Sequence, residues 1–165
     1  MSAASHFQFD DMQGLVRFAH GSLSETCFLL LDVKDAQLAR AWLQSAPVST
    51  AENVDPVPDK ALQIAFTASG LRAMEVSEAV VTGFSYEFVA GMAEENRARR
   101  LGDIGSNAPQ LWEWGGKQDE IPHLLLMLYV KDGLLADWRS TVTGPDFEKA
   151  FQVRTTLPTF SLGVF

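Results

Sequence analysis

The sequence predicts an α+β fold built on a ferredoxin-like, split βαβ sheet, the arrangement that dimeric α/β barrels also use. Four apolar, strand-sized segments are spread along the chain, and helical patterns follow the first and the third of them. The length of 165 residues, with 47% hydrophobic and 21% charged residues, is ordinary for one globular domain. We therefore expect residues 1–165 to form one ferredoxin-like domain, with a helical and loop insertion over about 77–121 between the second and third strands.

The spacing of apolar residues predicts a strand, a helix and a second strand in the first half of the chain. Cys27–Val33 is a run of large apolar residues, which is typical of a strand buried on both faces. Asp35 can cap a helix over Ala36–Ser45, and Pro47 ends that helix. In Ala61–Thr67 large side chains alternate with small or polar ones, which predicts a strand with one heavily packed face.

The segment after the second strand favours helices. Thr67 can cap a short helix, and residues 77–101 predict two helical pieces. Phe84, Phe88 and Met92 recur there at four-residue steps, with charges on the remaining face. This segment begins the predicted insertion.

Residues 102–116 have the composition of a loop, with several glycines and a proline. Long irregular loops in compact domains are often functional. Trp112 and Trp114 could stack a ligand here, or they could anchor the loop onto the domain, which is the more frequent use of tryptophan.

The final third predicts a strand, a helix and a last strand. Leu124–Val130 is the third buried strand, and Asp132 can cap the following helix until Gly144-Pro145 breaks it. Phe151–Leu157 alternates as a fourth strand. We expect four side chains of this helix to face inward, toward the core: Leu134, Leu135, Trp138 and Val142.

The charge balance argues against nucleic acid as a partner. The formal net charge is −8 and the pI is about 4.8, so a polyanion would need a strong local basic patch. The candidate patch, Arg97–Arg100, follows Glu94 and Glu95 on the same predicted helix. It is better explained as a solvated helix face with ion pairs.

Membrane insertion and secretion are also disfavoured. The longest apolar runs, Cys27–Leu31 and Leu124–Val130, are far shorter than the roughly 20 residues of a membrane-spanning helix. The N-terminus has no basic region leading into an apolar stretch, so no secretory signal is expected. Cys27 is the single cysteine, which agrees with a reducing compartment and a cytoplasmic location.

No complete catalytic constellation is visible in the sequence. The histidines, His6, His20 and His123, lie far apart, and Cys27 sits in a hydrophobic run where a small core residue is expected. No cluster has the spacing of metal ligands, and Gly102 and its neighbours follow a helix instead of preceding one. His123 remains a weak candidate for a cofactor-binding axial ligand, although a histidine at a strand edge is more often a satisfied polar tip.

The C-terminal end is unusually apolar. No charged residue follows Arg154, and the chain finishes with Phe160–Phe165. Free termini are usually polar, so we expect either a partner or the chain's own sheet to pack against this end. Both alternatives remain open.

Five sets of segments resemble one protein family. They are Asp11–Val16; Phe28–Val33 with Ala39–Leu43; Ala61–Ala73; Glu87–Ala93 with Arg100–Gly105 and Ala108–Gly115; and His123–Tyr129. In this order they resemble the N-terminal half of the dye-decolourising (DyP-type) haem peroxidases, whose own start reads Asp-Ile-Gln-Gly. The fourth set is the most specific, and together the segments span nearly the whole chain.

The resemblance implies a pair of ferredoxin-like domains in a complete family member, with haem b as cofactor and hydrogen-peroxide-dependent oxidation of dyes or phenols. In the family, a Gly-x-x-Asp-Gly motif supplies the distal aspartate, and a second domain supplies the distal arginine and the proximal histidine. This chain has no such motif, and Ser161–Phe165 resembles the stretch just before it. None of the family's catalytic or haem residues can be carried over, so we expect no catalytic residue, no metal site and no haem on this chain alone.

Three interpretations follow from this boundary. The chain could be the N-terminal domain of a DyP-type peroxidase, inactive alone and completed by a C-terminal peroxidase half, as a split gene product or an excised fragment. It could instead be a stand-alone, haem-free module that binds a partner or self-associates through its apolar sheet face. It could also be an atypical haem carrier that uses His123 or another histidine.

Overall fold

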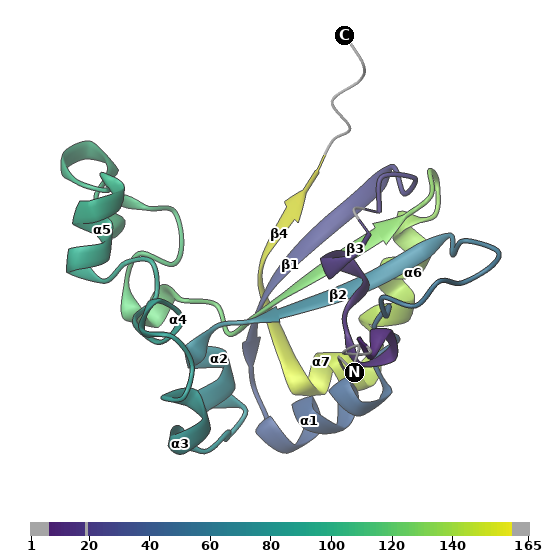
Figure 1. Cartoon of the computed structure of the whole chain (residues 1–165), viewed down its shortest axis with the longest axis horizontal. Coiled ribbons are helices and arrows are strands. Elements are labelled where there is room, and N and C mark those ends of the chain that lie inside the picture. The colour runs from purple at the N-terminus through teal and green to yellow at the C-terminus, as the bar shows by residue number, and fades with distance from the viewer. Residues whose placement is uncertain (1–6, 19, 160–165) are drawn as a thin grey trace, which may run out of the picture.

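A four-stranded antiparallel sheet organises the protein (Figure 1). The computed structural model describes residues 7–18 and 20–159, so His6 and Phe160–Phe165 lie outside the described residues. The strands lie in the order β2-β3-β1-β4, which is the ferredoxin-like order, and the predicted α+β class is confirmed. Their bounds are β1 Glu25–Val33, β2 Lys60–Phe66, β3 Leu124–Val130 and β4 Phe151–Pro158.

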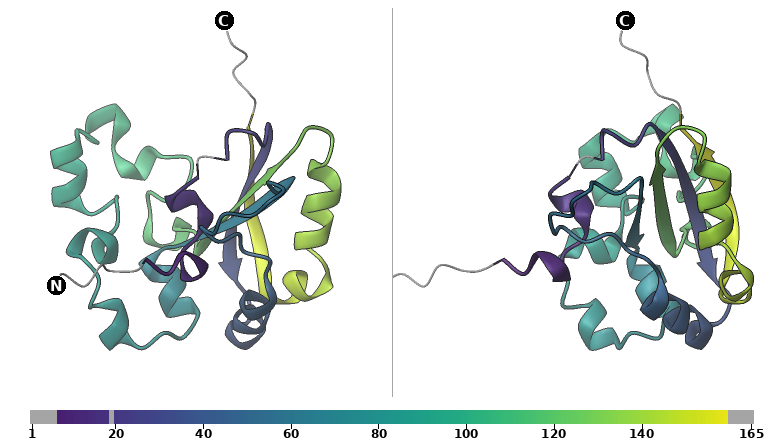
Figure 2. Two further views of the ribbon diagram at one scale, coloured as in Figure 1. Left: turned by 45° about the vertical axis from the view of Figure 1, so that its right-hand side comes forward. Right: turned by 90° about the vertical axis from the view of Figure 1, so that its right-hand side faces the viewer.

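Three helices cover one face of this sheet: α1 (Ala36–Ser45), α6 (Leu135–Val142) and α7 (Pro145–Ala150) (Figures 1 and 2). The carboxylate of Asp35 accepts a hydrogen bond from the Leu38 amide at 2.9 Å, so the predicted cap of α1 is confirmed. The helices bury the alternate side chains of the strands. The largest fully buried side chains of this core are Leu29, Leu31, Leu62, Leu124, Leu126, Leu128, Val130 and Phe147.

The register of the sheet places matching apolar residues opposite one another. Leu29 pairs with Leu126 in β3, and Leu126 pairs in turn with Ile64 in β2. All three side chains therefore enter the same core under the helices. The β1–β4 pairing shifts register between Leu30 and Leu31, as at a β-bulge.

A run of short helices lies between β2 and β3. It begins with α2 (Ala68–Ala73), whose N-cap Thr67 accepts the amide of Gly70 as the sequence predicts. Residues 77–101 then form three helices where the sequence predicts two. These are α3 (Glu78–Val81), α4 (Tyr86–Ala90) and α5 (Glu95–Leu101). In Figure 1, α4 and α5 stand apart from the sheet, beyond the end of β2.

The positions of the breaks explain this difference. Phe84 lies between α3 and α4, and α4 ends at Gly91, which has a φ of 77°. That backbone conformation favours glycine and stops a helix. Three short 3₁₀ turns complete the segment: Gly105–Asn107, Pro109–Leu111 and Gln118–Glu120.

The helix after β3 is capped differently from the prediction. The side chain of Asp132 makes no cap, and Leu134 occupies the N-cap position of α6. The Leu135 amide donates instead to the carboxylate of Glu25 in β1, at 3.2 Å. Leu134, which the sequence predicts to face inward, is 41% exposed because it precedes the first helical turn.

Gly144-Pro145 ends one helix and begins another. The sequence predicts only the break, but α7 starts at Pro145. Proline suits the first helical position because its fixed φ is already helical and the amide there needs no partner. Phe147 of α7 packs edge-on against Trp42 of α1, with ring centroids 5.5 Å apart.

No helix among the described residues is long and apolar enough to cross a bilayer.

Candidate functional site

His123 immediately precedes β3, and its ring is held by the backbone of β1. The Val33 amide donates a hydrogen bond to Nδ1 of His123 at 2.9 Å. Burial lowers the pKa of His123, while the nearby Asp32 opposes that effect. A neutral ring whose Nδ1 accepts a hydrogen bond carries its proton on Nε2. In this arrangement the ring offers no free lone pair to a metal.

Asp32 and Arg154 form an ion pair beside His123. The Nε and Nη2 atoms of Arg154 each donate to the Asp32 carboxylate at 2.9 Å, and Arg154 also donates to the Asp119 carbonyl. Both charged side chains are about three-quarters buried, at 26% and 24% exposure. The pair joins β1 to β4 and ties both strands to the loop before β3.

The other predicted groups do not converge with His123. His20 packs against Tyr129 with ring centroids 5.0 Å apart, and its buried Nε2 has no hydrogen-bond partner among the described residues. Burial lowers the pKa of His20. Cys27 is a core residue at 3% exposure, and burial raises the pKa of its thiol. Within residues 7–18 and 20–159, no group of three or more His, Cys, Asp or Glu side chains could hold a metal ion.

The sheet has a second, apolar face on the side away from α1, α6 and α7. The N-terminal segment crosses the β2 part of this face, where Leu15 donates its amide to Gln63 at 3.1 Å (Figure 2). Towards β4 the face carries apolar side chains that are neither fully buried nor fully exposed. They are Phe28, Leu125, Met127 and Leu157, and we call them the open sheet face.

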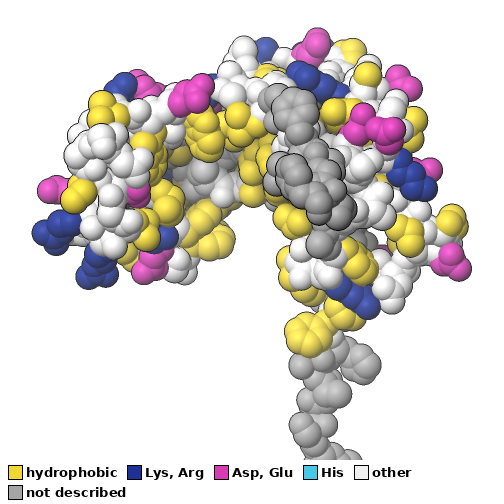
Figure 3. Space-filling view, turned by 90° about the horizontal axis from the view of Figure 1, so that it is seen from above, with side chains coloured by type: hydrophobic (Ala, Val, Ile, Leu, Met, Phe, Trp, Pro, Cys, Tyr) yellow, Lys and Arg dark blue, Asp and Glu magenta, His cyan; other side chains and the backbone are white. Residues whose placement is uncertain are grey.

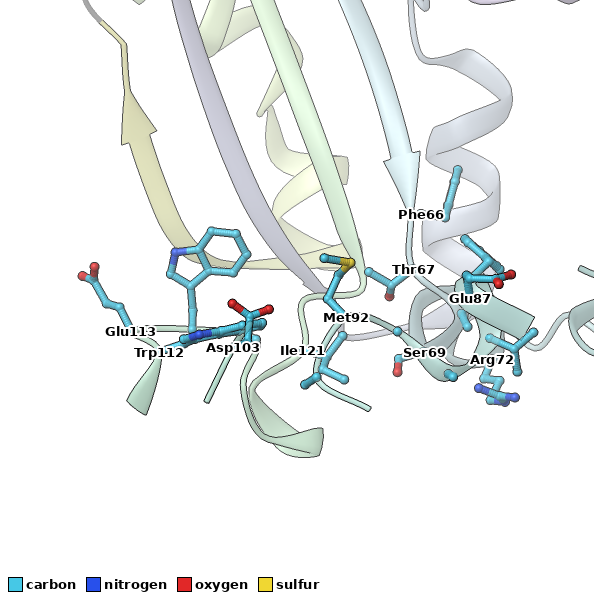
Figure 4. A pocket seen from close by; sticks show the side chains of 18 of the residues that line it. Phe66, Thr67, Ser69, Arg72, Glu87, Met92, Asp103, Trp112, Glu113 and Ile121 are labelled. Carbon is cyan, nitrogen blue, oxygen red and sulfur yellow. The ribbon is translucent and has the colours of Figure 1, made fainter. Parts of the chain in front are cut away.

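A cavity of about 780 Å³ lies between α2 and the loop that carries the two tryptophans. Figure 3 shows hydrophobic side chains lining the hollow between the insertion and the sheet. In Figure 4, Asp103 lies between Trp112 and Met92, with Thr67 and Glu87 on the other side of the cavity. The apolar walls come from Phe66, Phe88, Met92, Trp112, Trp114 and Ile121.

One wall of the cavity is fixed to the sheet by backbone contacts. Thr67 donates its amide to the His123 carbonyl at 3.1 Å, and its hydroxyl to the Pro122 carbonyl at 2.8 Å. Gly70 lies so close to His123 that a Cβ would overlap the His123 carbonyl. The start of α2 and the start of β3 therefore hold each other in place.

The opposite wall is fixed by side-chain hydrogen bonds. Trp112 donates its indole N–H to the Asn107 carbonyl at 3.0 Å, and the Asn107 amide donates to Asp103 at 2.8 Å. Trp112 thus anchors the loop, as the sequence suggests for tryptophan. Trp114 lines the same cavity but is 38% exposed, which leaves its indole accessible to a ligand.

Sequence reasoning missed this cavity. Its walls come from β2, α2, α4 and two loops, and no local pattern reports that such distant segments meet. Asp103 follows Gly102, which the sequence predicts only as a helix C-cap and turn. One signal in the sequence could have indicated the polar wall of this cavity. Asp103 and Asn107 are four residues apart, a spacing at which a side-chain amide can donate to a carboxylate within one turn.

Comparison with known proteins identifies a fold class. The sequence matches no protein-family model and no curated protein. The structure is similar to a DyP-type peroxidase from Anabaena sp., with a TM-score of 0.75 and 19% identity over 92% of this chain and 35% of that one. A fungal DyP-type peroxidase from Auricularia auricula-judae gives a TM-score of 0.69 and 20% identity over 95% of this chain and 34% of that one.

A dye-decolorizing peroxidase in complex with 2,6-dimethoxyphenol is also similar, with a TM-score of 0.70 and 16% identity over 93% of this chain and 34% of that one. At these identities the likeness is one of fold. The chain thus has the fold of part of a DyP-type peroxidase, and it spans about a third of the length of each solved structure. The structural similarity therefore confirms, for the fold, the resemblance to DyP-type peroxidases that the sequence shows.

Haem, the cofactor of this class, does not fit the described side chains. An iron ligand needs an accessible lone pair or a thiolate. His123 uses its Nδ1 lone pair on Val33, His20 is enclosed against Tyr129, and Cys27 is a buried, protonated thiol. No step of haem chemistry is assigned to these residues.

Proposed function

We propose that this chain is one ferredoxin-like half of a DyP-type haem peroxidase, and that it is inactive until a second half supplies the haem site. The single observation that carries the proposal is the structural similarity, which covers nearly all of this chain but only about a third of each peroxidase. The open sheet face supports it as well. An apolar patch of this kind on one side of a sheet is typical of a surface that another domain covers.

The role of this half is structural. The ion pair of Asp32 and Arg154 and the rigid junction at Thr67 keep the open sheet face and the cavity wall in fixed positions. A preformed surface loses little conformational entropy when a second domain packs on it. The chemistry, peroxide-dependent oxidation of dyes or phenols, would belong to the complete assembly.

The test has a sequence arm and a spectroscopic arm. We expect the coding region immediately downstream to encode a Gly-x-x-Asp-Gly motif followed by an arginine and a histidine. The present chain, titrated with hemin, should give the spectrum of free hemin and should not accelerate the oxidation of 2,6-dimethoxyphenol by hydrogen peroxide. The chain extended through the downstream segment should give a Soret band and activity.

Unrelated downstream sequence would count against the proposal. So would a shifted Soret band from the present chain that His123→Ala abolishes, because that result would favour the haem-carrier interpretation. The two variants His20→Asn and His123→Ala identify which ring is responsible.

Self-association through the open sheet face is a second candidate function. The same apolar side chains favour it, since two copies could cover each other's face around a twofold axis. Sedimentation of the present chain separates the two candidates. A dimer whose population rises with concentration and falls in Leu157→Glu favours self-association, whereas a monomer at all concentrations favours the half-peroxidase.

A further inference from the structure

The cavity beside α2 has the properties of a small-molecule site. Its volume of about 780 Å³ suits a ligand of several rings, and ligand pockets commonly combine apolar walls with a few polar groups. Both tryptophans of the loop line it, one anchored and one partly exposed. Four of its charged or amide side chains come from separate elements: Arg72, Glu87, Asp103 and Asn107.

The charges around the cavity favour a cation. Glu87, Asp103 and Glu113 line it, and Arg72 is the one basic side chain among the lining residues. Arg72 is already paired, because its Nε and Nη2 donate to the carboxylate of Glu78 at 3.0 and 2.8 Å. The cavity therefore keeps an excess of negative charge.

Asp103 is the carboxylate best placed to meet a ligand. It is partly buried, and its Oδ1 accepts the Asn107 amide, while Oδ2 has no partner among the described residues. Gly102 precedes it with a φ of 86°, which turns the chain sharply at the end of α5. The carboxylate is thus held beside the indoles before any ligand arrives.

We propose that this cavity binds an organic cation, a small molecule with an apolar or aromatic body and an ammonium group. The indole faces attract a cation through their ring electrons, and the apolar walls cover the rest of the molecule. The Asp103 carboxylate neutralises the positive charge in a partly dehydrated site. This inference concerns only residues of the present chain, so it does not depend on the haem-bearing half.

An anionic ligand is disfavoured by the same geometry. It would meet the partly buried Asp103 carboxylate, and the charge of the Arg72 guanidinium is already neutralised by Glu78. Arg97 donates from Nε to the sulfur of Met92 at 3.3 Å, but it is not among the residues that line the cavity. An uncharged apolar segment of another domain would fill the cavity without using Asp103.

The test compares three probes of similar size by isothermal titration calorimetry: benzyltrimethylammonium, benzyl alcohol and benzenesulfonate. We expect benzyltrimethylammonium to bind about tenfold more tightly than benzyl alcohol, and benzenesulfonate not to bind. Asp103→Asn should weaken binding of the cation about fivefold, because it removes the charge but keeps the acceptor for Asn107. Trp114→Leu should weaken it as well and should remove the accompanying fluorescence change.

Asp137→Asn is the matched control, because it removes the same charge from the exposed surface of α6, away from the cavity. It should leave the affinity for the cation unchanged. Circular dichroism confirms that each variant is folded. Equal affinity for the three probes, no saturable binding of the cation, or an equal effect of Asp103→Asn and Asp137→Asn would overturn the proposal.

Discussion

Gly70 occupies the point where α2 touches the start of β3. A Cβ at this position would overlap the carbonyl of His123, and this backbone has little room to move because the His123 amide donates to the Leu31 carbonyl of β1 at 2.8 Å. Gly70→Ala must therefore push α2 away from the Thr67 hydrogen bonds to Pro122 and His123. We expect the free energy of unfolding to fall by about 3 kcal/mol, measured by urea denaturation.

Gly21→Ala is the control for this substitution. A Cβ at Gly21 meets nothing within 4 Å, so the change should stay within about 0.5 kcal/mol of the parent protein. A Gly70→Ala protein as stable as the parent would show that α2 can slide on β3.

The sequence could not reveal this requirement for glycine. Gly70 stands in a short segment with ordinary helical spacing, and the group that it approaches belongs to a residue far along the chain. The same limit applies to His123. Its position at a strand edge was predictable, but its hydrogen bond to Val33 depends on the pairing of β1 with β3.

At the scale of elements, β2 is an edge strand whose outer side is satisfied by side chains and by the Ser49 amide, which donates to the Leu62 carbonyl at 2.9 Å. Gln13 acts like a residue of a neighbouring strand, because its Nε2 donates to the Ile64 carbonyl at 2.8 Å and its Oε1 accepts the Ile64 amide at 2.7 Å. Gln63 is fully buried and donates to the Ser49 carbonyl at 3.0 Å while accepting the Leu15 amide. The N-terminal segment thereby closes this edge against other chains.

Gln13→Ala should open the edge. It leaves the Ile64 amide and carbonyl without partners, so we expect a loss of about 2 kcal/mol in the free energy of unfolding. Hydrogen exchange measured by NMR should show faster exchange at the Ile64 amide. The control Gln8→Ala changes an exposed glutamine in the same segment and should leave Ile64 unaffected. Unchanged exchange at Ile64 in Gln13→Ala would contradict this role.

Elements with a strong local pattern were predictable, and those defined by distant contacts were not. The third strand matches its predicted bounds, Leu124–Val130, because a continuous apolar run marks it. The helix α7 was missed because Gly144-Pro145 resembles a stop, although proline at a first helical position also begins a helix. The cap of α6 comes from Glu25, which only the folded sheet brings near.

At the scale of the whole molecule, the fold class followed from the order of strands and helices, whereas the candidate site did not follow from any one segment. Strand order in this sheet depends on which apolar faces the helices must cover, and the spacing of apolar residues in the sequence indicates those faces. The cavity forms where separate segments of the chain come together in the fold. Of these segments, the sequence predicted a possible ligand contact only for the tryptophan loop. Its charge balance also depends on Arg72 pairing with Glu78, a contact between α2 and α3.

The pH dependence of stability is a property of the whole molecule. Near neutral pH we expect the two described histidines, His20 and His123, to dominate it. Burial lowers the pKa of both His20 and His123, so each ring takes up a proton more readily in the unfolded chain, where its pKa is about 6.5. Stability rises with pH wherever the unfolded state binds more protons. The contribution of these rings is therefore complete above about pH 6.5 and is lost as the pH falls through the lowered folded-state values.

We accordingly expect the free energy of unfolding, measured with urea, to stay nearly constant from pH 7.5 to about pH 6.5 and to decrease from there to pH 5.5, with a slope shared between the two rings. His20→Asn removes one titrating ring and suits the φ of 49° at that position, because asparagine tolerates left-handed backbone. His123→Asn removes the other ring, and each variant should flatten part of the slope. The carboxylates Glu78 and Glu94 have lowered pKa values, so their contributions are lost only in more acid solution. A slope that persists in the double variant would assign the dependence to other groups.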